Sequence, residues 1–366
     1  MKAVVATDLN TYGIEDINLA SPLTKEIRIK VKAAGLCHSD LSLIKGTVPA
    51  PFPMVLGHEG AGIVTEIGPD VTKFSVGDHV VLALQPVCGE CSNCHKGDFV
   101  NCMSFTLEQL VGGAMPDGTC RKTRPDGTPL TGALGLGCLS EETVVHENFA
   151  VKIGEHFPLD KACLTGCGVI TGATGAIFSG NIQTGDTVVV LGCGGVGLSA
   201  IQGARIAGAT RIIAVDIADN KLAMATNMGA TDIINSLNEN PVEKVQALTD
   251  GGADTTLECS GVTSVVQQAF DMLRTGGTLV QIGVPAMEAT FPISIGLLVL
   301  TGKIIKAGKY GGHNPQLDIP MLLELYSQGR LDLDGMVTKT YSLEQIHQAF
   351  DDMENNLNAR GVILFD

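Results

Sequence analysis

The stretch TVVVLGCGGVG, residues 187–197, decides how the second half of the chain folds. It opens on a continuous apolar run, residues 187–191, of the kind found in a parallel strand covered on both faces. Gly192, Gly194 and Gly197 then follow the pattern G-x-G-x-x-G, ahead of an apolar segment that reaches about Ile206. In such a turn the first glycine bends the chain, the second admits a pyrophosphate to the backbone, and the third lets helix and strand pack closely. The stretch therefore predicts a strand, a turn and a helix that bind a dinucleotide.

An acidic residue follows at the position where a dinucleotide-binding fold needs one. The next strand-like run, 211–216, ends at Asp216, about 20 residues beyond the last glycine of the motif. A carboxylate there accepts hydrogen bonds from ribose hydroxyls and repels a 2′-phosphate. Ile217 and Ala218 come next instead of an arginine. We therefore predict that the cofactor is NAD rather than NADP.

Strand and helix patterns alternate through the rest of this region. Further strands are expected near 231–235, 254–259, 277–283 and 303–309, with helices near 219–228, 241–249 and 264–274. Together with the two strands already described, these patterns complete a dinucleotide-binding sheet with right-handed crossovers. The sequence predicts an α/β fold, with a doubly wound parallel sheet of Rossmann type over 169–308.

Short strand patterns with frequent turns characterise the first half of the chain. The candidate strands are 2–6, 27–34, 61–68 and 79–84, and loops rich in proline and glycine separate them. A helix near 343–354 and the apolar run 362–365 close the chain and are expected to return to this half. We therefore predict a β-rich, barrel-like domain over 1–168, completed by 309–366.

Three candidate metal ligands lie far apart in this first half. Cys37, His58 and Cys167 form a set of two cysteines and one histidine, and acidic Glu59 follows the histidine directly. Three protein ligands leave the fourth position of a zinc ion open for water or substrate. A histidine by itself is more often hydrogen-bonded in a core, so this prediction rests on the whole set.

A second cluster has the spacing C-x2-C-x2-C-x7-C and comprises Cys88, Cys91, Cys94 and Cys102. Thiolates this close in sequence can enclose one ion tetrahedrally with no open position, which describes a structural zinc. An iron–sulfur cluster is the alternative, because C-x2-C-x2-C also opens ferredoxin-type sites. The other cysteines have no partner spacing and are interpreted as ordinary buried residues: Cys120, Cys138, Cys163, Cys193 and Cys259.

Composition excludes several classes of protein. Of the 366 residues 45% are hydrophobic and 17% are charged, which indicates a folded globular chain. A net charge of −15 argues against binding to nucleic acid or to an anionic membrane surface. We expect no signal peptide and no transmembrane helix, because no apolar run approaches ~18 residues. Without secretion signals, 11 cysteines favour reduced thiols and a cytoplasmic location.

These motifs together resemble the zinc-dependent alcohol dehydrogenases of the medium-chain dehydrogenase/reductase superfamily, in particular bacterial aryl- and primary-alcohol dehydrogenases. The pattern G-H-E-x-x-G-x5-G-x2-V runs from Gly57 to Val71, and the cysteine cluster, glycine-rich turn and Asp216 follow in family order. The resemblance covers essentially the whole chain and is weakest over 103–140. It implies a GroES-like catalytic domain, and it favours zinc over an iron–sulfur cluster in the cysteine lobe.

The resemblance also implies roles near the catalytic zinc. Cys37, His58 and Cys167 would be its ligands, with Glu59 able to approach the metal during ligand exchange. Asp40 would orient the imidazole ligand, as carboxylates next to metal-bound histidines commonly do. Among the catalytic residues, Ser39 would hydrogen-bond the substrate oxygen and start a proton relay, and His38 would also contact the cofactor.

The implied cofactor contacts are His38 and Arg360 at the pyrophosphate, Lys221 at the ribose, and Thr171 and Val284 at the nicotinamide. In the glycine-rich turn and beyond they are Gly192, Gly194, Gly195, Val196, Gly197 and Asp216. Many family members carry a relay histidine where this chain has Ser42. Serine cannot titrate near neutral pH, so the proton must leave through water, a cofactor hydroxyl or another group. We therefore expect slower or more pH-dependent oxidation.

The function that the resemblance implies is zinc-dependent, NAD-linked, reversible oxidation of primary alcohols to aldehydes, with aryl or allyl alcohols as the best candidates. A zinc-bound alkoxide would give hydride to the nicotinamide. Leu84, Phe52, Phe105, Leu107 and Leu134 are candidate apolar lining, and a homodimer or homotetramer is expected. Two alternatives remain: a glutathione-dependent formaldehyde dehydrogenase, although 43–48 lacks acids, and a crystallin-like structural protein, although both ligand sets are present.

Overall fold

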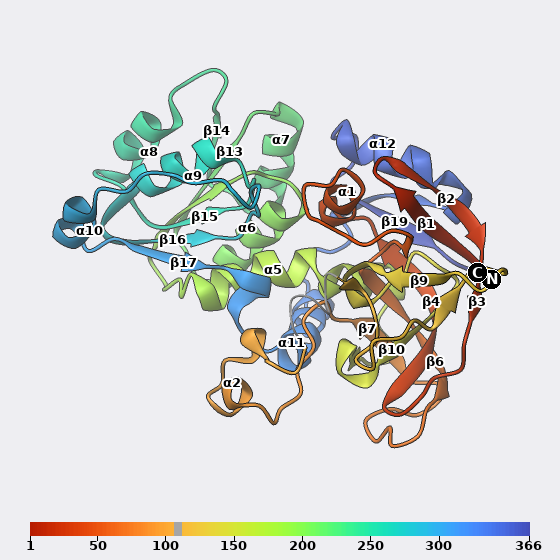
Figure 1. The fold of residues 1–366 in the computed structure, drawn as a ribbon. Coiled ribbons are helices and arrows are strands. Elements are labelled where there is room, and N and C mark those ends of the chain that lie inside the picture. Colours follow the sequence, from red (N-terminus) through yellow and green to blue (C-terminus); the bar gives the residue numbers. More distant parts are fainter. Residues whose placement is uncertain (106–111) are drawn as a thin grey trace. The chain divides into compact units, whose positions relative to one another are not determined.

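The computed structural model describes residues 1–105 and 112–366 (Figure 1). The chain forms two compact units. We call them the β unit, which comprises Met1–Cys167, Asn314–Leu325 and Leu333–Asp366, and the α/β unit, which comprises Gly168–His313 and Tyr326–Asp332. Within the described residues, no single helix is long and apolar enough to cross a membrane, whereas one bent pair, Leu159–Gly166 with Gly168–Ser179, meets the criteria of length and composition.

The α/β unit contains the predicted parallel sheet, and this fold prediction is confirmed. Its strands stand in the order β14-β13-β12-β15-β16-β17, which is the strand order 3-2-1-4-5-6 of a doubly wound dinucleotide-binding fold. Their bounds are Thr187–Leu191 (β12), Arg211–Asp216 (β13), Asp232–Asn235 (β14), Ala253–Glu258 (β15), Leu273–Gln281 (β16) and Ile304–Ala307 (β17). Val188, Val189 and Val190 of the central strand are fully buried, as expected of a strand covered on both faces.

One helix precedes these strands, and further helices connect them. Their bounds are Gly168–Thr174 (α5), Gly195–Ala207 (α6), Asp219–Met228 (α7), Pro241–Thr249 (α8), Thr263–Asp271 (α9) and Ile295–Thr301 (α10). A π-helical turn, Gly175–Ser179, continues α5, and a short 3-10 turn, Lys309–Gly312, follows β17. The Asn240 side chain accepts the backbone N–H groups of Val242 and Glu243, which fixes the start of α8.

Two boundaries in this unit differ from the prediction. The helix expected to reach residue 274 ends at Asp271, because β16 already begins at Leu273. The stretch 309–366 was expected to belong wholly to the first domain, but 309–313 and 326–332 lie in the α/β unit. Hydrogen bonds explain this: Ser179 Oγ donates to the carbonyl of Gly311 at 3.1 Å, and Gln202 exchanges two hydrogen bonds with the backbone of Asp332.

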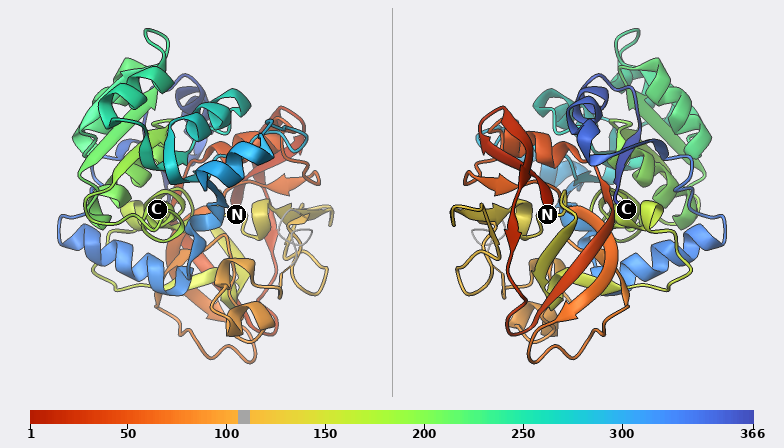
Figure 2. Two further views of the ribbon diagram at one scale, coloured as in Figure 1. Left: turned by 90° about the vertical axis from the view of Figure 1, so that its left-hand side faces the viewer. Right: turned by 90° about the vertical axis from the view of Figure 1, so that its right-hand side faces the viewer.

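The described residues of the β unit form two sheets. One sheet has the order β2-β1-β5-β9-β8-β3, and the other has the order β11-β7-β6-β4-β19-β18 with β10 paired to β4. The strands are Lys2–Asp8 (β1), Thr11–Asp16 (β2), Asn18–Leu19 (β3), Glu26–Gly35 (β4), Met54–Val55 (β5), Glu59–Ile67 (β6), His79–Leu82 (β7), Lys122–Thr123 (β8), Pro129–Gly132 (β9), Glu142–His146 (β10), Ala150–Lys152 (β11), Val337–Tyr341 (β18) and Arg360–Leu364 (β19). Figure 2 shows the curvature of the long red and orange strands of this unit in two further views.

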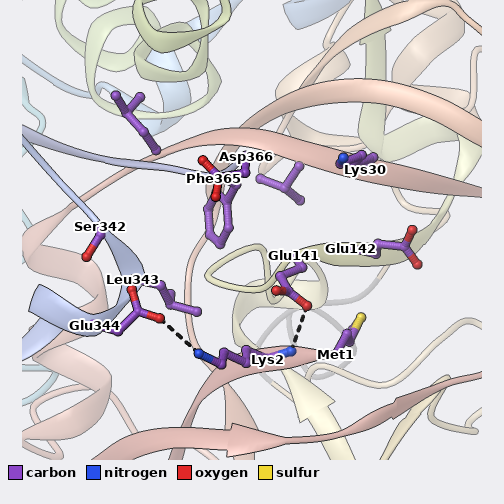
Figure 3. Close-up of a pocket in the computed structure, with 12 residues that line it drawn as sticks. Met1, Lys2, Lys30, Glu141, Glu142, Ser342, Leu343, Glu344, Phe365 and Asp366 are labelled. Atoms are coloured by element: carbon purple, nitrogen blue, oxygen red, sulfur yellow. Dashed lines mark hydrogen bonds and ion pairs between the residues drawn. The ribbon is translucent and has the colours of Figure 1, made fainter.

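The described residues also form these helices outside the parallel sheet of the α/β unit. They are His38–Ile44 (α1), Ser92–His95 (α2), Leu159–Ala162 (α4), Pro315–Ser327 (α11) and Ile346–Glu354 (α12), with 3-10 turns at Phe99–Asn101, Ala133–Gly135, Glu147–Phe149, Cys163–Gly166 and Leu343–Gln345. The C-terminal strand β19 pairs with β4, so the predicted return of the tail to the first half of the chain is confirmed. Both chain ends line a pocket of about 610 Å³, where Lys2 pairs with Glu344 and its N–H donates to Glu141 (Figure 3).

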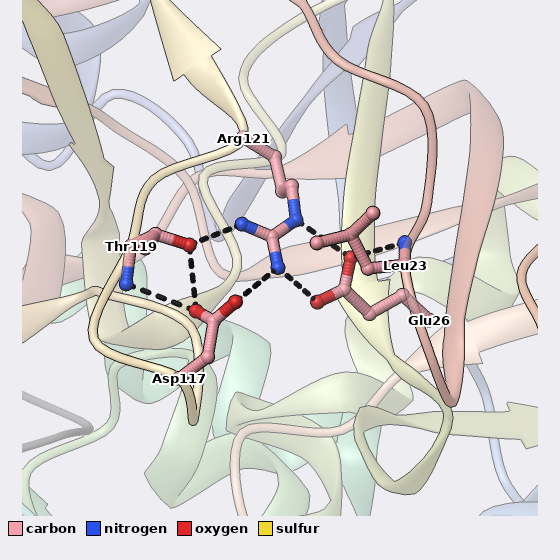
Figure 4. A network of polar contacts seen from close by, with 5 residues as sticks. All are labelled: Leu23, Glu26, Asp117, Thr119 and Arg121. Carbon is pink, nitrogen blue, oxygen red and sulfur yellow. Dashed lines mark hydrogen bonds and ion pairs between the residues drawn. The ribbon is translucent and has the colours of Figure 1, made fainter.

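A buried ionic network anchors the loop that precedes β8. The Arg121 guanidinium donates to both oxygens of Glu26, at 2.7 and 2.6 Å, and also to Asp117 at 2.7 Å (Figure 4). Glu26 in turn accepts the backbone N–H of Leu23 at 2.9 Å. A buried charge is stable only when it is paired and hydrogen-bonded. Glu26 meets both conditions, because it pairs with Arg121 and accepts the N–H of Leu23.

Candidate active site and metal centres

The pairing of β4 with β6 brings the two ends of the candidate catalytic cluster together. Gly35 at the end of β4 lies opposite Glu59 at the start of β6. Cys37 therefore follows one strand at the same edge where His58 precedes the other. A Cβ on Gly35 would lie 2.3 Å from Oε2 of Glu59, so only glycine allows this approach. Cys167 joins them because the 3-10 turn before it packs on both strands.

These four residues form one buried group of potential ligands. The ligand atoms of Cys37, His58, Glu59 and Cys167 all lie within 4.8 Å of one another. His58 is fully buried, and its Nε2 atom has no hydrogen-bond partner. An orphaned imidazole nitrogen beside two thiols is costly unless it binds something. Two sulfurs, one nitrogen and an adjacent carboxylate are a donor set that fits zinc.

Asp40 lies on the other side of the imidazole ring. Its Oδ2 atom is 3.1 Å from Nδ1 of His58, and its Oδ1 atom accepts the N–H of Gly57 at 2.9 Å. Both side chains are fully buried. A carboxylate at Nδ1 fixes the ring orientation and leaves Nε2 for a metal ion. The structure thus brings the sequence-predicted Asp40 next to His58.

Electrostatics make the cluster attractive to a cation. Burial alone would lower the pKa of His58, but the Asp40 carboxylate and Cys37 beside the ring raise this pKa well above its ordinary value. A hydrogen bond from Cys167 lowers the pKa of the Cys37 thiol well below its ordinary value. The surroundings are therefore negative, which favours a divalent cation, and the binding of such an ion releases the protons held by its ligands.

Arg360, which the sequence places at the cofactor pyrophosphate, makes a contact beside the metal ligands that the motifs did not indicate. Its guanidinium pairs with Glu59 and also donates to the carbonyl of Leu36 at 3.1 Å. Burial would lower the pKa of Arg360, but the Glu59 carboxylate and the thiols of Cys37 and Cys167 raise it. The pair joins β6 to β19, and no local spacing could predict a contact between residues so distant in sequence.

The second predicted cluster is also assembled. The sulfur atoms of Cys88 and Cys102 are 3.5 Å apart, those of Cys88 and Cys94 3.9 Å, and those of Cys91 and Cys102 4.0 Å. Backbone N–H groups of Glu90 and Cys91 each donate to the sulfur of Cys88 at 3.3 Å. Although burial opposes it, these bonds and one from Ser104 lower the pKa of Cys88 to about 6. Four close thiols with N–H donors suit a closed zinc site.

The residues expected near the substrate lie on α1 and in the core of the β unit. Ser39 lies in the first turn of α1, with its Oγ atom 3.7 Å from the sulfur of Cys37, and His38 at the helix start is exposed. Ser42 is half-buried one turn further along this helix. Phe105 packs in the core, with its ring 4.9 Å from that of Phe149.

The structure describes three of the four other candidate lining residues. Phe52 and Leu134 pack against the same core cluster as Phe105, and Leu84 follows β7. Leu107 lies outside the described residues.

The glycine-rich turn of the α/β unit has the conformation that its motif predicts. Gly192 has a φ of 89°, in the left-handed region that glycine tolerates. A Cβ on Gly197 would lie 1.8 Å from the carbonyl oxygen of Gly192, so α6 can pack this closely only through glycine. A Cβ on Gly194 would meet nothing within 4 Å, which leaves this part of the backbone open to a ligand. Gly195 and Val196 then begin α6.

Asp216, at the carboxyl end of β13, holds this turn in place. Its Oδ2 atom accepts the N–H of Cys193 at 2.7 Å, and its Oδ1 atom accepts those of Ile217 and Ala218 at 2.8 and 3.0 Å. Lys221 lies in the first turn of α7, Thr171 lies in α5, and the exposed Val284 follows β16. The structure therefore places Asp216 in contact with the turn, and the other predicted cofactor residues on neighbouring elements of this unit.

Comparison with known proteins identifies both halves of the chain. Residues 24–155 match the family described as alcohol dehydrogenase GroES-like domain, and residues 195–328 match the family described as zinc-binding dehydrogenase. An "NDMA-dependent alcohol dehydrogenase" of Amycolatopsis methanolica is 42% identical over 99% of this chain and 98% of its own length. An "S-(hydroxymethyl)glutathione dehydrogenase" of Paracoccus denitrificans is 38% identical over 96% of each.

A solved structure agrees with these matches. The crystal structure of benzyl alcohol dehydrogenase from Acinetobacter calcoaceticus superposes with a TM-score of 0.94 at 33% identity, covering 100% of this chain and 99% of that one. The family matches, the relatives and the shared fold agree with the resemblance inferred from the sequence motifs. The chain therefore belongs to the zinc-dependent alcohol dehydrogenases of the medium-chain dehydrogenase/reductase superfamily.

Proposed function

We propose that this enzyme catalyses the NAD-linked, reversible oxidation of primary alcohols to aldehydes at a zinc ion held by Cys37, His58 and Cys167. The observation that carries the proposal is the buried cluster in which the Nε2 atom of His58 has no partner while Asp40 faces Nδ1. A zinc ion bound there acts as a Lewis acid and lowers the pKa of a bound hydroxyl. The nicotinamide supplies the hydride chemistry.

The protein's own residues then have positional and proton-handling roles. Ser39 accepts the substrate hydroxyl proton, since its Oγ atom lies next to the sulfur of Cys37. Asp40 keeps the ring of His58 in its ligating orientation. Glu59, paired with Arg360, stays close to the metal ligands and can take part in ligand exchange. Ser42 cannot titrate near neutral pH, so the proton leaves through water or a cofactor hydroxyl.

The proposed cofactor is NAD, with Asp216 as the discriminating residue. Its carboxylate lies at the end of β13, and the backbone N–H groups that it accepts come from the turn and from the two residues after it. A 2′-phosphate would meet this negative charge, whereas ribose hydroxyls can donate to it. His38 and Arg360 at the pyrophosphate, Lys221 at the ribose, and Thr171 and Val284 at the nicotinamide complete the proposed contacts.

For the substrate we propose primary alcohols with an aryl or allyl group. The benzyl alcohol dehydrogenase named among the structural relatives supports this class. Glutathione-dependent formaldehyde oxidation is the second candidate, since a relative at 38% identity is named for S-(hydroxymethyl)glutathione. The segment 43–48 contains no acid to hold that substrate, and its Lys45 pairs with Glu354. A non-catalytic role is not favoured, because both ligand clusters are intact.

A panel of substrates tests this proposal. Zinc-loaded enzyme is assayed with benzyl, allyl and aliphatic primary alcohols and with S-(hydroxymethyl)glutathione, each with NAD, NADP and NDMA as acceptor. NDMA is included because a relative is named for it. We expect NAD-linked activity that is highest with benzyl or allyl alcohols. Activity only with the glutathione adduct, or only with NADP, would refute the corresponding part of the proposal.

We further propose that the enzyme is a homodimer or homotetramer. The helix α10 contains no buried residue, and Val299 and Leu300 on it are 75% and 82% exposed. Next to it, all residues of β17 are exposed, and in the described part of the chain this strand pairs only with β16. An apolar patch beside an open sheet edge is typical of a subunit contact. The mass in solution, measured by light scattering of the wild type and of Leu300→Asp, tests this proposal. A charge in the apolar patch should dissociate the oligomer into smaller species.

A cytoplasmic location is also proposed. All eleven cysteines lie in the described residues, and none of them forms a disulfide. Cysteine-rich chains without disulfides are typical of reducing compartments.

A further inference from the structure

Glu258 is a buried carboxylate at the edge of the parallel sheet where dinucleotides bind. It is the last residue of β15 and is fully buried, and Gln281 is the last residue of the neighbouring strand β16. Ligands of doubly wound folds bind outside the carboxyl ends of the strands, where the strand order reverses. That reversal lies between β12 and β15, so Glu258 stands beside it.

The carboxylate gathers hydrogen bonds from two different loops. Its Oε1 atom accepts the N–H of Ser260 at 2.7 Å, the N–H of Gly261 at 3.1 Å, and the Ser260 hydroxyl. Its Oε2 atom accepts the same Gly261 N–H at 3.1 Å and Nε2 of Gln281 at 2.6 Å. Gln281 Nε2 also donates to the carbonyl of Gly283 at 2.7 Å. One side chain thus fixes the loop after β15 and, through Gln281, the loop after β16.

These loops pack on each other and on the glycine-rich turn through their backbones. A Cβ on Gly283 would lie 2.2 Å from the nitrogen of Gly261 and 2.8 Å from Oε2 of Glu258. A Cβ on Gly192 would lie 3.0 Å from the nitrogen of Ser260. The shortest of these contacts are to backbone atoms, so a shift of the Ser260 loop would move its neighbours directly. The position of that loop therefore depends on the hydrogen bonds to Glu258.

The topology indicates which half of the cofactor this arrangement serves. A doubly wound sheet consists of two mononucleotide-binding halves. Strands β12–β14, with Asp216, form the half assigned to adenosine, so β15–β17 form the half that faces the nicotinamide mononucleotide. We propose that Glu258 is a positioning residue for the nicotinamide half of the bound dinucleotide, an inference that rests on the proposed NAD-linked function. Glu258 acts through Ser260, Gly261 and Gln281 and does not itself touch the cofactor.

The charge of Glu258 matters because a carboxylate only accepts hydrogen bonds. A glutamine at this position would point an NH2 group at the N–H of Gly261 or at Nε2 of Gln281, so that donors face donors or the Gln281 amide must turn and give up its hydrogen bond to Gly283. Leaving such buried groups unsatisfied destabilises the local arrangement. Glu258→Gln is therefore a nearly isosteric change that loosens the two loops without altering the volume of the side chain.

The test compares two ligands on the full-length, zinc-loaded enzyme. AMP probes the adenosine half alone, and NAD requires both halves. For Glu258→Gln we expect an NAD dissociation constant roughly tenfold higher, as for the loss of one or two buried hydrogen bonds, with AMP affinity unchanged. Ser260→Ala, which removes one donor and keeps the carboxylate, should weaken NAD binding by a smaller factor of about three. Calorimetric titration measures both ligands.

Asp254→Asn is the matched control. Asp254 lies in the same strand near its opposite end, where it accepts the N–H of Thr187 at 2.8 Å and pairs with Arg274. This variant should lose stability but keep the wild-type ratio of NAD to AMP affinity. Equal NAD affinity in wild type, Glu258→Gln and Ser260→Ala, or equal losses for NAD and AMP, would overturn the inference. A wild-type enzyme that binds AMP but not NAD would instead contradict the proposed function.

Discussion

At the scale of single residues, Asp40 is the side chain on which the candidate zinc site most depends beyond the ligands themselves. It is fully buried, lies 3.1 Å from Nδ1 of His58 and accepts one backbone N–H. Asp40→Asn keeps the shape but removes the charge that supports a ligating imidazole. We expect zinc affinity at this site to fall by roughly 10- to 100-fold, with alcohol oxidation lost in parallel.

Competition with a chromophoric chelator measures this change. Zinc in the four-cysteine cluster serves as the internal control, because Asp40 contacts none of those cysteines in the described structure. Wild-type zinc affinity at both sites in Asp40→Asn would contradict the role assigned to the carboxylate.

Lys122 gives a prediction about stability and pH. It is 5% exposed and donates to the carbonyl of Leu136 at 3.1 Å and to Oγ1 of Thr143 at 2.8 Å, and burial lowers its pKa to about 8. Between about pH 8 and the ordinary pKa of 10.5 the unfolded chain binds a proton that the folded chain does not. The free energy of unfolding should therefore rise with pH across this window, through release of a buried charge.

Lys122→Met isolates this contribution. Thr143 can still donate to Leu136, at 2.7 Å, so no polar atom loses its last partner. We expect the variant to be more stable at pH 7 by on the order of 1 kcal/mol, and its advantage to shrink as the pH rises towards 10. Urea unfolding midpoints at several pH values measure both effects. Parallel pH profiles for wild type and variant would show that Lys122 does not titrate in this window.

At the scale of elements, substitutions at two glycines of the glycine-rich turn should separate an effect on ligand binding from an effect on stability. A Cβ on Gly194 meets nothing, whereas a Cβ on Gly197 would lie 1.8 Å from the carbonyl of Gly192. We expect Gly194→Ala to unfold at the wild-type temperature but to bind NAD at least about tenfold more weakly, because the methyl group occupies the space of the pyrophosphate. Gly197→Ala should lower the melting temperature, because α6 must move away from β12.

Thermal unfolding and NAD titration of the two variants check this contrast. The reverse pattern, an unstable Gly194→Ala and a stable Gly197→Ala, would mean that the turn is not the one described.

The elements of the α/β unit were predictable because their patterns are local. The run 187–191 and the glycines after it define β12 and α6, and Asp216 ends β13 as expected. The misassigned stretch 326–332 shows the limit: its place depends on the hydrogen bonds between Gln202 and Asp332, which no periodicity encodes. Likewise, spacing predicted the cluster Cys88–Cys102, but not the contact of Arg360 with Glu59, which exists only after β19 has joined β4.

At the scale of the whole molecule, two ligand clusters with different chemistry stand in one chain. Cys37, His58 and Cys167, with Glu59 beside them, leave a position open for substrate, whereas the four cysteines between 88 and 102 can close around an ion. On the proposal made above, the first cluster serves the reaction and the second serves the fold of its lobe. Removal of metal should therefore have two separable consequences, loss of activity and loss of local structure.

The central claim is that the first cluster holds a catalytic zinc. Its most direct test is zinc content by mass spectrometry, measured together with benzyl alcohol oxidation, for wild type, Cys37→Ser and Cys91→Ser. We predict about two zinc ions per chain in the wild type, and in Cys37→Ser about one with no activity. Cys91→Ser should also hold about one and lose stability first. Undiminished zinc content and activity in Cys37→Ser would contradict the assignment.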